Sequence, residues 1–160
     1  MMRGTSLRKA VCIVLIAVNL AVIWGNSLMT GADSGAMSGS VMEFVRNLLN
    51  LPESVEAQLH HFIRKAAHFT EFACFGILMT WLLGMLGQKG LQLASCPVFL
   101  GLAVACVDET IQIFTEGRAS SLVDVWIDTC GAAAGMMMLL TGHYLYEKSK
   151  HNQKHLEETT

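Results

Sequence analysis

Charged residues are scarce in this sequence of 160 residues. Asp, Glu, Lys and Arg make up only 15% of it, whereas hydrophobic residues make up 52% and the mean hydropathy is +0.45. A soluble domain of this length usually carries about a quarter charged residues, so the composition favours a protein that lies in a lipid bilayer. The formal net charge of −2 is too small to predict a nucleic-acid partner.

Familiar metal and disulfide patterns are missing as well. The five cysteines are widely spaced, include no C-x-x-C pair and fall inside apolar runs, so we interpret them as buried free thiols that pack as small hydrophobic side chains. No H-E-x-x-H sequence is present, so the helical zinc motif of metalloproteases is absent. The sequence shows no internal repeat and no second domain.

What the sequence does contain is four apolar runs, each long enough to cross the roughly 30 Å hydrocarbon core of a bilayer as an α-helix. They predict an all-α, polytopic membrane protein that forms a single domain over residues 1–160. The four transmembrane helices are expected at residues 10–28, 66–86, 93–114 and 122–144, followed by a polar cytoplasmic tail at 147–160 that frays. A cleaved signal peptide is the alternative for the first run, but its length and the lack of an A-x-A site favour a retained helix.

The segment between the first two spans divides into two parts. Residues 31–39 are rich in Gly, Ser and Ala and are predicted to form a loop. Ser40 and Glu43 then fit a capping box, and apolar residues follow at helical spacing. We therefore expect a short extracytoplasmic amphipathic helix to begin at Ser40, either on the membrane surface or packed against the bundle.

The placement of Arg and Lys predicts the direction of the spans. With the N-terminus inside, seven of the eleven cationic residues are cytoplasmic, in agreement with the positive-inside rule. These residues are Arg3, Arg8, Lys9, Lys89, Lys148, Lys150 and Lys154. Both termini are then cytoplasmic, and the polar ends of the second, third and fourth spans meet near the outer side of the membrane.

The densest group of ionisable side chains runs from Asp108 to Asp128, between two apolar runs. Ionisable groups at a membrane boundary are costly unless they are paired, hydrated or used in function. Polar residues in the outer half of the second span are expected to join them. The candidate ligand-binding residues are Lys65, His68, Glu71, Asp108, Glu109, Gln112, Arg118, Asp124 and Asp128.

Helical spacing predicts which way the last of these residues point. Asp124 and Asp128 share an arc of roughly 60° with Gly131 and Gly135, at about 100° per residue. The two glycines form a G-x-x-x-G pair, which lets two helices approach closely. The aspartates should therefore point into the bundle rather than toward lipid.

In these residues the chain resembles the VanZ-like family of small bacterial membrane proteins. The matching segments, spread over residues 10–144, are Asn26-Ser27, Lys65-x-x-His68-x-x-Glu71, Asp108-Glu109-x-x-Gln112, Gly117-Arg118 and Asp124-x-x-x-Asp128-x-x-Gly131-x-x-x-Gly135. The resemblance implies a four-helix protein of the bacterial inner membrane and a link to resistance against glycopeptide antibiotics of the teicoplanin type. The family usually has Asn where this chain has Asp128, so the family's role for that position does not carry over directly.

Three functions fit the polar cluster, and we favour the first, an outward-facing pocket that binds an anionic cell-envelope ligand. Such a ligand is a lipid head group, a lipid-linked cell-wall precursor or a lipoglycopeptide. Arg118 would bind its carboxylate or phosphate bidentately, and Lys65 would add a point charge. Membrane lipids are thus expected partners, a homo-oligomer is compatible with the sequence, and nucleic acid is not expected.

The two alternatives use the same residues differently. In a metal-assisted hydrolase or transferase acting on a lipid-linked envelope substrate, a divalent cation would neutralise the acids and polarise a phosphoryl group. Its candidate ligands are His68, Glu71, Asp108, Glu109 and Asp124. In a purely structural bundle, the basic residues would instead pair with the acids and fasten the helices together.

The orientation can be tested by cysteine labelling in intact cells, in a chain whose five native cysteines are replaced. A membrane-impermeant maleimide should label Ser38→Cys and Ser120→Cys directly, because both lie in outer segments. It should label Gln88→Cys only after permeabilisation, because the turn that carries Lys89 should stay in the cytoplasm. Labelling of Gln88→Cys from outside would reverse the predicted orientation.

Overall fold

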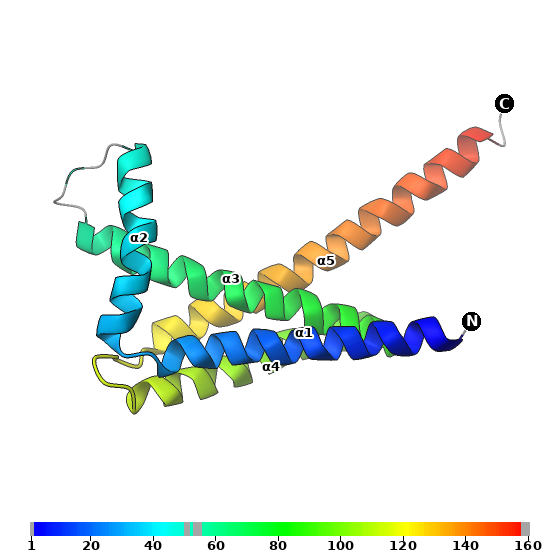
Figure 1. Ribbon diagram of the computed structural model, residues 1–160. Helices are drawn as coiled ribbons and strands as arrows, with labels where there is room; N and C mark the ends of the chain where they lie inside the picture. Colours follow the sequence, from blue (N-terminus) through cyan, green and yellow to red (C-terminus); the bar gives the residue numbers. More distant parts are fainter. Residues whose placement is uncertain (1, 50–51, 53–55, 158–160) are drawn as a thin grey trace.

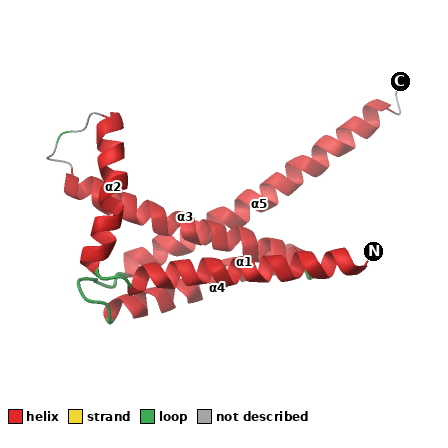
Figure 2. Ribbon diagram, in the orientation of Figure 1, coloured by secondary structure: helices red, strands yellow, loops and turns green. Residues whose placement is uncertain are grey.

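A computed structural model of the protein describes residues 2–49, 52 and 56–157. Within these residues the chain forms helices and no strand (Figure 1, Figure 2). The helices are α1 (Met2–Leu28), α2 (Gly31–Leu49), α3 (Glu56–Met85), α4 (Gly90–Ile113) and α5 (Leu122–Glu157). Four of them, α1, α3, α4 and α5, are long and apolar enough to cross a membrane. The predicted all-α, polytopic architecture is confirmed.

The four long helices alternate in direction, so the bundle has two chemically different ends (Figure 1). One end carries the start of α1 and the short turn between α3 and α4. The opposite end carries the last residues of α1, the first half of α3 and the turn between α4 and α5. We call this second end the polar end. Figure 1 shows α2 running across it and the last part of α5 leaning away from the bundle.

Glycines on α5 allow it to lie directly against α3, its most extensive partner in the bundle. A Cβ atom at Gly131 would meet the backbone oxygen of Phe69, and one at Gly135 would meet the backbone of Ala73. Both glycines are buried. The predicted close packing through the G-x-x-x-G pair is confirmed, and it holds the α5 face that carries Asp124 and Asp128 against α3.

The apolar core is narrow, because most apolar side chains face outward, as is usual for helices that contact lipid. One buried cluster is formed by Ile23, Phe72, Ala105 and Val125 from all four long helices. A second, formed by Cys12, Ile16 and Phe75, lies between α1 and α3. All five cysteines are free thiols, as expected, but the expectation that they are buried holds only for Cys12, because Cys96 is half-buried and Cys74, Cys106 and Cys130 are exposed.

The prediction for the start of the amphipathic helix was wrong. α2 begins at Gly31 and not at Ser40, so residues 31–39 are helical rather than a loop. Thr30 is the actual capping residue, because its hydroxyl donates to the Asp33 carboxylate at 2.7 Å and accepts the Asp33 N–H at 3.2 Å. The Gly31 N–H also donates to the Glu116 carbonyl at 3.0 Å. These contacts outweigh the weak helix propensity of the Gly- and Ser-rich segment.

The prediction that the chain frays from residue 147 was also wrong for the residues described. α5 continues without a break to Glu157, and the described side chains beyond residue 140 are exposed. The segment 143–157 contains neither Gly nor Pro, so nothing in it interrupts a helix that has already started. Residues 158–160 of the predicted tail lie outside the described part of the chain.

The packing of α5 on α3 predicts opposite effects for two glycine substitutions. Gly135→Ala should lower the melting temperature of the detergent-solubilised protein, because overpacking of this kind costs about 1–3 kcal/mol. Gly142→Ala is the matched control, since it lies on the same helix with open space around its Cβ position. Alanine is the better helix former by about 1 kcal/mol, so this variant should be as stable as the wild type or more stable. Equal losses in both variants would contradict the close packing.

Candidate functional site

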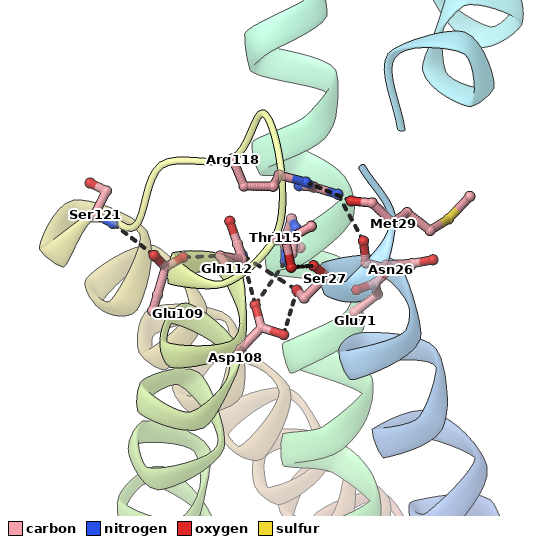
Figure 3. A network of polar contacts seen from close by, with 11 residues as sticks. Asn26, Ser27, Met29, Glu71, Asp108, Glu109, Gln112, Thr115, Arg118 and Ser121 are labelled. Carbon is pink, nitrogen blue, oxygen red and sulfur yellow. Dashed lines mark hydrogen bonds and ion pairs between the residues drawn. The ribbon is translucent and has the colours of Figure 1, made fainter. Parts of the chain in front are cut away.

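Asp108 on α4 lies at the centre of the polar network shown in Figure 3. Its side chain is completely buried, with 0% of its surface exposed. The carboxylate accepts a hydrogen bond from the Ser27 hydroxyl at 2.6 Å and one from the Gln112 amide at 3.0 Å. Because Gln112 follows Asp108 by one helical turn, the two side chains share a face of α4. The two donors replace part of the hydration that the carboxylate loses on burial.

Glu109, the next residue on α4, connects this helix to the start of α5. Its carboxylate accepts the backbone N–H of Ser121 at 2.7 Å and the Gln112 amide at 3.3 Å. Ser121 directly precedes α5, so the carboxylate lies at the N-terminus of that helix, where a negative charge is favoured.

Glu71 on α3 makes the corresponding contact with α1. It accepts a hydrogen bond from the Asn26 side chain at 2.7 Å. Its second carboxylate oxygen has no partner within the described residues. Through Asn26, the end of α1 is therefore held between α3 and the α4–α5 turn.

Arg118, in the α4–α5 turn, binds backbone rather than an acid. Its guanidinium donates to the carbonyl of Asn26 at 2.7 Å and to that of Met29 at 3.2 Å (Figure 3). These carbonyls belong to the C-terminal end of α1, where a helix leaves acceptors unsatisfied and favours a positive charge. Burial lowers the pKa of Arg118, and Arg64 lowers it further, while Asp108 and Glu109 act in the opposite direction. Arg118 thus caps α1.

Lys65 and Asp124 form an ion pair between α3 and α5, with 2.7 Å between the Lys65 Nζ and an Asp124 carboxylate oxygen. Both side chains are partly exposed, at 25% and 22%. Water competes for such a pair, so its contribution to stability is modest. It does fix where these two side chains lie.

A small cavity opens among these residues, with a volume of about 10 Å³, which is enough for about one water molecule. Six of the predicted site residues line it: Lys65, His68, Glu109, Gln112, Asp124 and Asp128. The other three, Glu71, Asp108 and Arg118, lie beside it in the hydrogen-bond network. The structure therefore brings all nine predicted residues to the polar end, and their binding of a ligand stays a prediction.

Asp128 differs from the other acids of the cluster. Only 1% of its side chain is exposed, yet neither carboxylate oxygen has a hydrogen-bond partner among the described residues. His68 and Asp108 are close to it, and each of the three residues offers a ligand atom within 4.8 Å of the others. An imidazole and two carboxylates at this spacing can hold a metal ion.

A model of the VanZ/LLP1 family matches residues 11–143, which include every residue of this network. The chain belongs to the VanZ/LLP1 family. Neither a curated protein nor a solved structure matches it. The resemblance drawn from the sequence motifs is confirmed, and the motifs of this VanZ/LLP1 protein are the segments that meet at its polar end.

Four residues of the VanZ/LLP1 site were not among those predicted. Asn26 and Ser27 supply side-chain hydrogen bonds, Ser121 supplies a backbone N–H, and Arg64 lines the cavity. Asn26-Ser27 was noted in the sequence as a segment of the family resemblance but not as part of the site, and Arg64 could have been included as a cation next to Lys65. The contribution of Ser121 is a backbone group, for which the sequence carries no signal.

The hydrogen bond to Asp108 predicts that Ser27→Ala will destabilise the VanZ/LLP1 fold. The substitution removes a donor to a fully buried carboxylate, and hydrogen bonds to charged groups are worth about 1.5–3 kcal/mol. The melting temperature in detergent should fall accordingly. Thr110→Ala is the control, because it also removes a hydroxyl from this end of the bundle, but an exposed one that bonds only to the Cys106 carbonyl. An equal or smaller loss in Ser27→Ala would show that Asp108 does not depend on this donor.

Proposed function

We propose that this membrane protein binds an anionic ligand of the cell envelope at the mouth of the polar cavity. The observation that carries the proposal is that the Arg64 guanidinium has no partner among the described residues. It lines the cavity, yet it forms no hydrogen bond or ion pair with another described residue. A guanidinium without a partner can bind a phosphate or carboxylate with two parallel hydrogen bonds.

The structure changes which cation is best suited to that role. Arg118 is engaged by the carbonyls of α1, and Lys65 is paired with Asp124. Arg64 therefore replaces Arg118 as the proposed bidentate anchor, and Lys65 contributes a nearby charge.

The size of the cavity limits how the ligand is held. A space for about one water molecule cannot enclose a head group. The ligand would instead rest at the mouth of the cavity and place at most one oxygen inside. Lipid head groups, lipid-linked cell-wall precursors and lipoglycopeptides all present a phosphate or carboxylate in this way.

The proposed cellular orientation agrees with this ligand class. With both termini in the cytoplasm of a bacterium, the polar end faces the outer leaflet of the inner membrane, where envelope precursors are exposed. α2, which is packed against α3, would then lie along the membrane surface beside the site. Sequestering or altering such a ligand is a physical route to the implied resistance against teicoplanin-type glycopeptides.

The structural bundle and the metal-assisted enzyme each explain fewer of the contacts observed at the polar end. In a purely structural bundle Arg64, Lys65 and Arg118 should all pair with acids, but among the described residues only Lys65 does so. A metal-assisted hydrolase or transferase is the second candidate, and the convergence of His68, Asp108 and Asp128 supports it. That alternative requires a bound metal ion.

The proposal is tested with two soluble probes that differ only in the phosphate, farnesyl phosphate and farnesol. The purified protein should bind farnesyl phosphate more tightly, as measured by microscale thermophoresis in a neutral detergent. Arg64→Gln should weaken that binding about tenfold, the equivalent of one charge-assisted hydrogen bond, and leave farnesol binding unchanged.

Arg8→Gln is the matched control, because Arg8 is an exposed arginine near the other end of the bundle. It should bind farnesyl phosphate like the wild type. Equal affinity for the two probes, or equal weakening by the two arginine substitutions, would contradict anion binding at the polar end.

A further inference from the structure

The carboxyl group of Asp128 is buried without a hydrogen-bond partner among the described residues. It projects from α5 into the protein with 1% of its side chain exposed, and neither oxygen has a partner in the described part of the chain. The Nδ1 atom of His68 is also buried and unpartnered. Two unsatisfied polar groups side by side are rare in protein interiors, and a bound ion is one of the usual reasons for them.

The groups that surround this position are arranged like ligands of one ion. His68 comes from α3, Asp108 from α4 and Asp128 from α5, and their ligand atoms lie within 4.8 Å of one another. His68 Nδ1 and an oxygen of Asp108 are 4.0 Å apart. Two ligands of a tetrahedral zinc ion stand about 3.4 Å apart, given bonds of about 2.1 Å. Side-chain rotations that shorten these separations to about 3.4 Å would let all three residues bind one ion. We propose that His68, Asp108 and Asp128 bind one zinc ion.

The mixture of imidazole and carboxylate ligands and the small size of the cavity favour zinc over the harder divalent cations. Calcium and magnesium prefer six or more oxygen ligands and seldom use imidazole. A six-coordinate ion would need three further ligands here, whereas the cavity holds about one water molecule. Zinc with three protein ligands takes a single water in its fourth position. The small cavity therefore suits an ion with one water better than an ion with several waters.

The neighbours of Asp108 orient it for this role. The Ser27 hydroxyl donates to one of its oxygens, and the Gln112 amide donates to the other, which is the oxygen nearest His68. Hydrogen bonds of this kind fix metal-binding carboxylates in place. A zinc ion would also offset the charges of Asp108 and Asp128, neither of which forms an ion pair with a Lys or Arg among the described residues.

The zinc site goes beyond the proposed ligand binding and does not depend on it, since Arg64 is not among the metal ligands. The two are nevertheless adjacent, because His68, Asp128 and Arg64 line the same cavity. The open coordination position would face that cavity, where a phosphate or carboxylate held by Arg64 could reach it.

The test measures zinc bound to the full chain, purified without a histidine tag and stripped with a chelator. After dialysis against buffered micromolar zinc, mass spectrometry should find one zinc per chain. Asp128→Asn and His68→Gln should each weaken zinc binding by at least about a hundredfold, since loss of an outer-shell partner alone costs 10–100-fold. Arg64→Gln should bind zinc like the wild type, which keeps this result separate from that for anion binding.

Asp124→Asn is the matched control. Asp124 lies one turn from Asp128 on α5 and lines the cavity, but it is paired with Lys65 and is not one of the three ligands. This variant should keep wild-type zinc affinity. Absence of zinc from the wild type, equal zinc in Asp128→Asn, or equal losses in Asp124→Asn and Asp128→Asn would each overturn the proposal. If Asp128→Asn fails to fold, His68→Gln decides it.

Cobalt substitution tests the geometry. Four-coordinate cobalt(II) absorbs visible light far more strongly than six-coordinate cobalt(II), so the wild type loaded with cobalt should be intensely coloured. A weak spectrum with stoichiometric cobalt would overturn the four-coordinate assignment.

Discussion

A carboxyl group buried at the polar end needs a hydrogen-bond donor or a counter-charge, because losing water around a charge inside a membrane bundle is costly. Most of the acids there are satisfied by a different part of the chain. Asp108 uses Ser27 from α1, Glu109 uses the backbone before α5, and Glu71 uses Asn26. Burying these acids therefore ties the helices together. In a bilayer this matters more than in water, because apolar contact alone gives helices little reason to associate.

Close backbone packing supports that network from the middle of the bundle. The glycines of α5 let its acidic face lie against α3, so Asp124 reaches Lys65 and Asp128 comes close to His68. Arg118 anchors the α4–α5 turn to the end of α1, and the same turn accepts a hydrogen bond from the first residue of α2. The position of α2 thus depends on the contacts that build the site.

The sequence was sufficient for features that follow from periodicity and hydropathy. The four spans, the glycine face of α5 and the meeting of the polar segments at one end all followed from apolar runs and helical spacing. What it could not supply was the choice of partner for each polar side chain. Arg118 was expected to bind a ligand, but it binds backbone carbonyls, which every residue possesses. The helical start at Gly31 was missed because Thr30 and a tertiary contact with Glu116 override the local composition.

The central claim is that the polar end is a binding site. Most of its carboxylates accept hydrogen bonds that hold the helices together, but Asp128 has no partner among the described residues and is available to a ligand. Two isosteric substitutions in the metal-free protein test it most directly. Asp128→Asn should leave the melting temperature unchanged or raise it, because it removes a buried charge that no group in the described part of the chain compensates. Asp108→Asn should lower it, because Ser27 and Gln112 are arranged around a carboxylate. A large loss of stability in Asp128→Asn, equal to that in Asp108→Asn, would show that the cluster is a closed structural network instead.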